Sequence, residues 1–120
     1  MLVRIDPTSD TALFDQVAGS IRADMVAGTI RPGDKLAPAR ELAAGLDVNL
    51  HTVLRAYQLL RDEGLVDMRR GRGAVATLAA GALSQLRSEI LELAQKAFAL
   101  GMSPDSLAAL VRDSLRGESD

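Results

Sequence analysis

The sequence has 120 residues, of which 48% are hydrophobic and 25% charged, and its formal net charge is −2. This length supports one modest hydrophobic core with an appendage, and the apolar content argues against a disordered chain. The absence of cysteine excludes a disulfide framework and a thiolate metal site. No apolar run approaches the length of a membrane span, so we expect a soluble, cytoplasmic protein without a membrane partner.

The first residues predict a short strand followed by a long helix. Residues 2–5 can form a strand, which would then pair with a hairpin later in the chain and complete a three-stranded sheet. A helix is expected over residues 11–27. Its inner face is formed by Leu13, Val17, Ile21 and Met25. We interpret this helix as core scaffold without a functional role.

The central stretch, residues 41–60, predicts two helices joined by a very short turn. Leu42, Ala43 and Leu46 give the first helix an inner face. Asn49 is a good N-cap for the second helix. The inner stripe of that helix is formed by Val53, Ala56, Tyr57 and Leu60. Two short helices this close are expected to cross steeply, which is typical of a helix-turn-helix that reads a DNA major groove. An ordinary helical hairpin is the alternative.

A β-hairpin is predicted directly after the second helix. Gly64 can adopt the left-handed conformation that ends a helix, and residues 65–77 favour two short strands. The tip of the hairpin contains Gly71 and Gly73, which allow close backbone approach to phosphates. Its positive charge comes from Arg69, Arg70 and Arg72. A hairpin in this place indicates a wing, and a solvated turn is the alternative for so arginine-rich a tip.

The distribution of charge matters more than the net value. Residues 49–60 contain Arg55 and no acid, and residues 68–77 contain three arginines and no acid. A locally basic surface on a nearly neutral protein can still bind DNA, although its non-specific affinity is weaker.

The last third of the chain predicts two more helices. Apolar residues alternate at spacings of four and three, which indicates a seam for another helix. The seam residues are Leu83, Leu86, Ile90, Leu93, Ala97 and Leu100. Gly101 ends this helix, and Ser103 with Pro104 begins the next. Two helices with one apolar face each do not close a core, so residues 78–120 either form a homodimer or fold back onto residues 1–77.

A family resemblance rests on an ordered set of short motifs. These are Leu13-Phe14-Asp15-Gln16-Val17, residues 28–36, Arg40-Glu41-Leu42-Ala43, Thr52-Val53, Glu63-Gly64-Leu65-Val66 and Arg69-Arg70-Gly71-Arg72-Gly73. In this order they resemble the winged-helix domain of the GntR family of bacterial transcription regulators. Asn49, Thr52-Val53 and Arg55-Ala56-Tyr57 resemble its YtrA subfamily in particular. The resemblance implies a mainly α fold with a small β-wing and a dimeric repressor of an inverted-repeat operator.

The sequence departs from the family pattern at three places. Pro38 stands where a capping serine is usual, and we expect it at the first helical position. Ala37 before it has no oxygen that could cap the helix, so the cap is weakened by about 1 kcal/mol. Asp47 stands where glycine is usual, and aspartate tolerates unusual backbone angles. Leu50 and Leu54 stand where many members carry a DNA-contacting arginine. They either touch thymine methyl groups or widen the core face.

The resemblance and the charge pattern together predict a DNA-contacting set. Arg40 lies where the family commonly contacts DNA, and its alternative is an ion pair with Glu41 or Asp47. Arg55 can bond guanine in bidentate fashion or hold a phosphate. His51 either contacts DNA or is an ordinary exposed polar residue. The full set is Arg40, Asn49, His51, Thr52, Arg55, Arg70, Gly71, Arg72 and Gly73.

The sequence therefore predicts a homodimeric transcription regulator with double-stranded DNA as its partner and no cofactor or metal. By resemblance, the short tail is too small for the large effector pocket of other subfamilies. The sequence does not decide whether an effector binds. The alternative function is a winged helix that contacts protein instead of DNA, which the low net charge and the two leucines favour. One histidine, no cysteine and no clustered acids argue against an enzyme.

Overall fold

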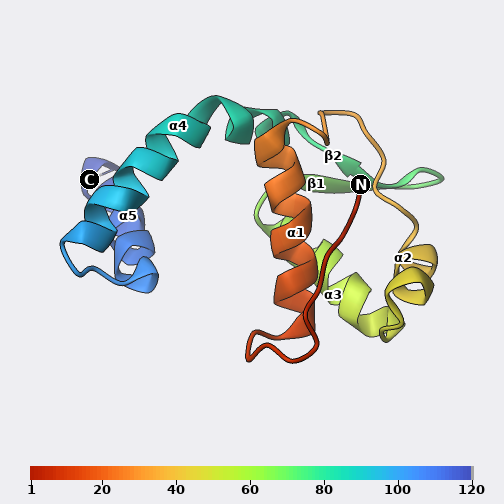
Figure 1. Ribbon diagram of the computed structural model, residues 1–120. Helices are drawn as coiled ribbons and strands as arrows, with labels where there is room; N and C mark the ends of the chain where they lie inside the picture. The colour runs from red at the N-terminus through yellow and green to blue at the C-terminus, as the bar shows by residue number, and fades with distance from the viewer. Residues whose placement is uncertain (120) are drawn as a thin grey trace. The chain divides into compact units, whose positions relative to one another are not determined.

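The computed structural model describes residues 1–119, which form two compact units, one covering residues 1–85 and one beginning at Leu86 (Figure 1). The elements in chain order are α1 (Leu13–Ala27), α2 (Ala39–Leu46), α3 (Leu50–Asp62), β1 (Val66–Arg69), β2 (Gly73–Ala76), α4 (Leu78–Ala99) and α5 (Pro104–Ser119). This order confirms the predicted fold class, a mainly α chain with a winged helix-turn-helix and two further helices. None of the helices in the described part of the chain combines the length and hydropathy of a membrane span.

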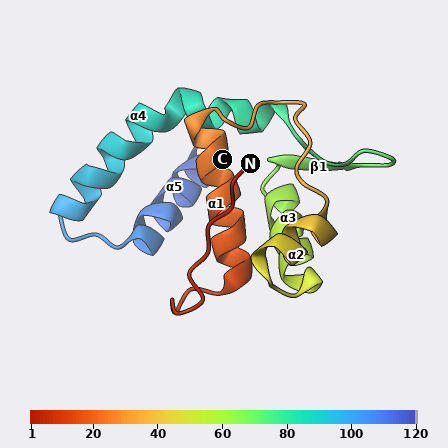
Figure 2. The ribbon, with the colours of Figure 1, turned by 45° about the vertical axis from the view of Figure 1, so that its right-hand side comes forward.

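The core of the first unit is built by α1 and α3, which lie side by side (Figure 2). From α1 it takes Val17, Ala18, Ile21 and Met25. From α3 it takes Val53, Ala56, Tyr57 and Leu60, the stripe that the sequence predicts. Each large side chain buried in this way stabilises the fold by about 1.5–3 kcal/mol. The packing therefore fixes how α3 is rotated about its own axis.

The turn between α2 and α3 preserves the predicted helix-turn-helix. Asp47 takes the left-handed conformation, with φ 55° and ψ 48°, as expected for a residue in the usual place of a glycine. Asn49 caps α3, because its side-chain oxygen accepts a hydrogen bond of 2.8 Å from the backbone N–H of His51. Both features are local to the turn, which is why the residue types alone predict them.

The start of α2 corrects one prediction. Pro38 is the N-cap and not the first helical residue: its φ and ψ are −54° and 137°, and its carbonyl accepts the first helical bond, from Leu42. The physical reason is that the proline ring restricts φ but leaves ψ free to stay extended. Proline has no side-chain oxygen, so the expected loss of a side-chain cap is confirmed. Instead, the Tyr57 hydroxyl donates a 2.6 Å bond to the Ala37 carbonyl and ties this end of α2 to α3.

The sheet corrects a second prediction. Residues 2–5 form no strand; Val3 is buried, and the Arg4 N–H donates to Ser20 Oγ of α1 at 3.1 Å (Figure 1). The third position of the sheet is taken by residues 33–36, where Lys35 bridges Val75 of β2. The backbone of the N-terminal segment hydrogen-bonds to Ser20 and Gln16 of α1 instead, while the backbone of residues 33–36 hydrogen-bonds to β2.

The wing is a two-stranded antiparallel hairpin whose register runs from the Val66–Ala76 pair to the Arg69–Gly73 pair. Thr77 closes its base, because its hydroxyl donates to the Gly64 carbonyl at 2.6 Å. Gly64 has a φ of +81°, so it takes the left-handed conformation predicted for the end of α3. The hairpin is thereby attached to the helix that precedes it.

The first turns of α4 pack on the core of the first unit. Ala80 is fully buried there and Leu83 is half-buried. A Cβ built on Gly81 would lie 2.9 Å from Pro32 Cγ, so only glycine fits this approach. The predicted domain division after residue 77 stays a prediction, and the compact units meet between Gln85 and Leu86.

The second unit contains the rest of α4 and α5. Gly101 ends α4 in the left-handed conformation, and Ser103 Oγ accepts a 3.1 Å bond from the Ser106 N–H at the start of α5. Ala97 is buried, whereas Met102 and Leu107 are half-buried. A pocket of about 410 Å³ with mainly apolar walls lies beside them. Most of the apolar side chains of this unit stay exposed.

We predict that Tyr57→Phe lowers the free energy of unfolding by about 0.5–1.5 kcal/mol, because the hydrogen bond to Ala37 is lost while the ring stays packed. Burial raises the pKa of Tyr57 to about 12, above its ordinary value of 10.0. The folded state therefore favours the neutral hydroxyl, so this contribution is complete below pH 10 and is lost as the pH rises from 10 to 12. Urea unfolding of both proteins at neutral and alkaline pH measures the difference.

The stability advantage of the parent protein over Tyr57→Phe should shrink at the alkaline pH. Lysines titrate equally in both proteins, so they cancel in this comparison. A constant difference between the two proteins would show that the hydroxyl of Tyr57 is not protected by the fold.

Candidate nucleic-acid interface

The outer face of α3 is polar and carries no acid before Asp62. With the core stripe turned inward, His51 and Arg55 are exposed and Thr52 is half-buried. Asn49 is exposed, and its side-chain oxygen is used by the cap, so its amide NH₂ stays available to a partner. Gln58 is also exposed on this face, three residues after Arg55. Sequence reasoning missed Gln58, although the spacing from His51 and Arg55 is a usable signal.

Arg55 does not extend freely from the helix. The carbon of its guanidinium lies 3.8 Å from the centroid of the Phe14 ring, which belongs to α1. The sequence alone predicts that α1 is core scaffold without a functional role. No spacing rule could link these two residues, because their contact depends on how α1 and α3 pack.

Leu50 and Leu54 differ in their surroundings, so the two alternatives, widening the core face or facing outward where DNA could be touched, apply to different residues. Leu50 is half-buried and packs against the core, so it widens the core face. Leu54 is 41% exposed and lines a groove of about 520 Å³ between α2, α3 and the wing. Met68 of β1 is also exposed on this groove. Of the two leucines, only Leu54 is placed to touch a thymine methyl group.

The arginines at the wing tip, Arg70 and Arg72, form no ion pairs with acids in the described part of the chain. Both are exposed. Gly71 and Gly73 have φ values of 79° and 72°, which a residue with a Cβ rarely adopts. Arg69 differs, since it lies 3.9 Å from Asp67 of the same strand.

Arg40 is exposed in the first turn of α2. Within residues 1–119 it makes no ion pair with Glu41 or Asp47, so the structure lacks the contact of the alternative reading. The first turn of α2 also lacks a side-chain cap, which leaves its N–H groups open to solvent or to an anion.

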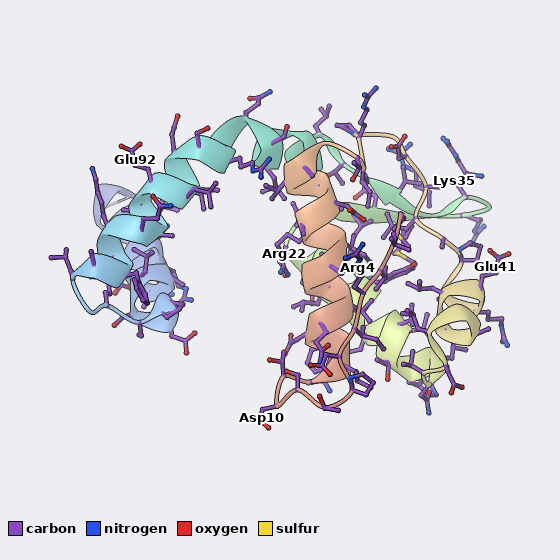
Figure 3. The ribbon with its side chains drawn as sticks, in the orientation of Figure 1. Arg4, Asp10, Arg22, Lys35, Glu41 and Glu92 are labelled. Carbon is purple, nitrogen blue, oxygen red and sulfur yellow. The ribbon has the colours of Figure 1, made fainter. Side chains whose placement is uncertain are left out.

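Lys35 is a cation that sequence reasoning missed. It is exposed on the segment that bridges β2, and Figure 3 shows it beside the wing, with Glu41 on the neighbouring α2. Like Arg70 and Arg72, it has no ion pair among the described residues. The next residue, Leu36, is apolar and buried, and adjacent residues of an extended chain face opposite sides. This alternation could have predicted that Lys35 is exposed.

A second contact holds α1 and α3 together away from the exposed basic residues. Arg22, labelled on α1 in Figure 3, donates two hydrogen bonds, of 2.9 Å and 2.7 Å, to the carboxylate of Glu63. Both side chains are about one-third exposed, so the pair contributes on the order of 0–1 kcal/mol. Its bidentate geometry links Arg22 of α1 to Glu63, the C-cap residue of α3.

The described residues contain no group of three histidine, cysteine, aspartate or glutamate side chains that could hold a metal ion. His51 is exposed and takes part in no such group. This surface therefore offers a binding partner hydrogen-bond donors, positive charge and one apolar groove.

Comparison with known proteins gives consistent results. Residues 13–75 match the family model described as bacterial regulatory proteins, gntR family. The HTH-type transcriptional repressor YtrA of Bacillus subtilis is 30% identical over 118 residues, covering 93% of this chain and 91% of the relative. A solved GntR family transcriptional regulator from Listeria monocytogenes is 29% identical with a TM-score of 0.63, covering 91% of this chain and 98% of its own. YtrA from Sulfolobus acidocaldarius is 33% identical with a TM-score of 0.61, covering 82% and 99%.

Proposed function

The chain belongs to the GntR family of bacterial regulatory proteins, and from that premise we propose that it is a transcriptional repressor that binds an inverted-repeat operator as a homodimer. One observation carries the proposal. The polar outer face of α3 has no acid before Asp62, and the wing that follows α3 presents Arg70 and Arg72 without ion pairs among the described residues.

The geometry of α3 suits a major groove. Its 13 residues span about 20 Å, and the core stripe leaves one face for contact with base edges. On this face Asn49, His51, Thr52 and Arg55 are the proposed contacts, as predicted, and Gln58 adds an amide to them. Arginine recognises guanine through two acceptors, and asparagine or glutamine recognises adenine in the same way. These side chains are therefore proposed to determine which operator the protein selects.

The wing and α2 are proposed to hold the DNA backbone. Arg70 and Arg72 supply charge at the wing tip, where Gly71 and Gly73 let the backbone approach a phosphate closely. Arg40 would contact a phosphate from the open first turn of α2. Because these contacts carry no sequence information, they set orientation and salt dependence.

The homodimer is proposed to form through the exposed part of the predicted seam. Leu86, Ile90 and Leu93 are 46%, 50% and 47% exposed in the single chain. Leu83 and Ala97 are used within the chain, since Leu83 packs on the core of the first unit and Ala97 is buried and lines a pocket together with Leu107 of α5. Covering the exposed residues with a second copy would bury apolar surface, and a twofold axis would match an inverted repeat.

A protein-contact function is the second candidate. The exposed Leu54 and Met68 on the groove and the net charge of −2 favour it. A groove with apolar walls suits a peptide or helix better than it suits phosphate. The dependence of binding on salt separates the two functions, because counterion release accompanies DNA binding.

We predict that the full chain enriches an inverted-repeat duplex when DNA is selected from a random pool. The affinity for that duplex should fall with salt, with a slope of about 0.9 logarithmic units per phosphate contact. Fluorescence anisotropy over a range of salt concentrations measures this slope. If no sequence is enriched and binding does not depend on salt, the protein-contact function is the correct one.

We predict that Arg72→Ala weakens binding to the selected duplex and to random duplexes by the same factor, because a phosphate contact does not depend on sequence. The plot of log affinity against log salt should also become shallower by about one unit. Arg112→Ala, on exposed α5, removes the same charge and serves as the matched control. An unchanged salt slope in Arg72→Ala, with the slope of the control likewise unchanged, would place Arg72 away from the DNA.

We predict that replacing Leu86 and Leu93 by Asp yields monomers in sedimentation at micromolar concentration and weakens operator binding. The matched control replaces Ser88 and Gln95 by Asp. These exposed residues keep the same spacing but lie about 200° further round α4. The control should stay dimeric. A parent protein that is itself monomeric at this concentration would contradict the proposed seam.

A further inference from the structure

The guanidinium of Arg55 rests on the ring of Phe14, with 3.8 Å between the guanidinium carbon and the ring centroid. Arg55 is exposed on α3, whereas Phe14 lies in the first turn of α1 and is half-buried against the core. One of the two partners is therefore held by the core, and the other faces solvent.

A stacked arginine keeps its hydrogen-bonding capacity. The ring covers one face of the planar guanidinium, while the N–H donors point outward in its plane. A carboxylate in the place of Phe14 would occupy those donors and neutralise the charge. Among the side chains that the structure describes, those of residues 1–117, Arg55 has no ion pair and no hydrogen-bond acceptor, so its donors are available to an external group.

The contact belongs to a fixed register between two helices. Phe14 and Arg55 are 41 positions apart, and so are Arg22 and Glu63 at the other contact. The two contacts are eight positions apart in both segments, 14 to 22 in α1 and 55 to 63 in α3 and its C-cap, which is about 12 Å of helix. Between them lies the buried packing of α1 on α3. The core therefore determines where the Phe14 ring stands beneath Arg55.

We propose that Phe14 is a positioning residue for DNA recognition, which holds the Arg55 guanidinium so that it presents two parallel N–H donors to a pair of acceptor atoms on the DNA. The inference rests on the proposed function, because it requires that the outer face of α3 binds DNA. The acceptor pair belongs either to a guanine edge or to a phosphate, since both accept a bidentate arginine. The benefit is that a flexible side chain is ordered before the DNA arrives, so less conformational entropy is lost on binding.

The test compares Phe14→Leu with Phe14→Tyr, using the duplex that the full chain selects from a random pool and a random duplex at matched salt. Leucine keeps apolar volume but removes the ring face, whereas tyrosine retains it. Phe14→Leu should lose about two- to tenfold in affinity for the selected duplex, and Phe14→Tyr should restore binding close to that of the parent. Urea unfolding confirms that both variants are folded under the assay conditions.

A double-mutant cycle separates positioning from a general structural effect. In an Arg55→Ala background, Phe14→Leu should cost less than about twofold, because there is no guanidinium left to position. An equal loss from Phe14→Leu in both backgrounds would overturn the inference. A loss confined to the selected duplex assigns the acceptor pair to guanine, and a loss on both duplexes assigns it to phosphate.

If Phe14→Leu does not fold, the stacked geometry can still be tested by NMR on the parent protein. The protons next to the guanidinium of Arg55 should show upfield ring-current shifts in the free full-length chain, and ordinary arginine shifts would overturn the stacked geometry. Failure of the proposed function looks different, because the parent protein would then enrich no duplex at all. A parent that binds DNA while its variants behave additively contradicts the positioning role alone.

Discussion

The burial of one stripe of α3 is the constraint on which the rest of the first unit depends. Val53, Ala56 and Leu60 are fully buried, so the helix cannot rotate about its axis without moving them into solvent. A shift of one residue in this stripe would turn the outer face by about 100°. The direction of every proposed base contact, the position of Arg55 over Phe14 and the wall of the groove at Leu54 all follow from this rotation.

The surface around that face shows how a chain with a net charge of −2 can present a cationic site. Arg40, Arg70 and Arg72 have no acid partner among the side chains that the structure describes, whereas Arg22 and Arg69 each have one. An unpaired exposed cation can exchange its water and counterions for a phosphate without first breaking an internal contact. Charge placement, and not total charge, therefore supports the proposed role of this surface.

The features that residue types predict are those decided within a few residues. The left-handed Asp47, the Asn49 cap and the glycine-containing wing each depend on local backbone preferences, and all three are confirmed. Residue types alone do not show which distant segment lies beside β2, and residues 33–36, not the predicted residues 2–5, hydrogen-bond to it. The separation of Leu50 from Leu54 and the contact of Phe14 with Arg55 depend on how helices pack, which periodicity alone does not specify.

The chain contains a single tyrosine and no tryptophan. The tyrosine is Tyr57, whose hydroxyl joins α3 to the carbonyl that precedes α2. Tyrosine absorption and emission in the near ultraviolet therefore report on one junction, between α3 and the segment that begins α2. A reorientation of α2 against α3 that breaks this hydrogen bond would change the environment of the only tyrosine, so it can be followed optically without an introduced label.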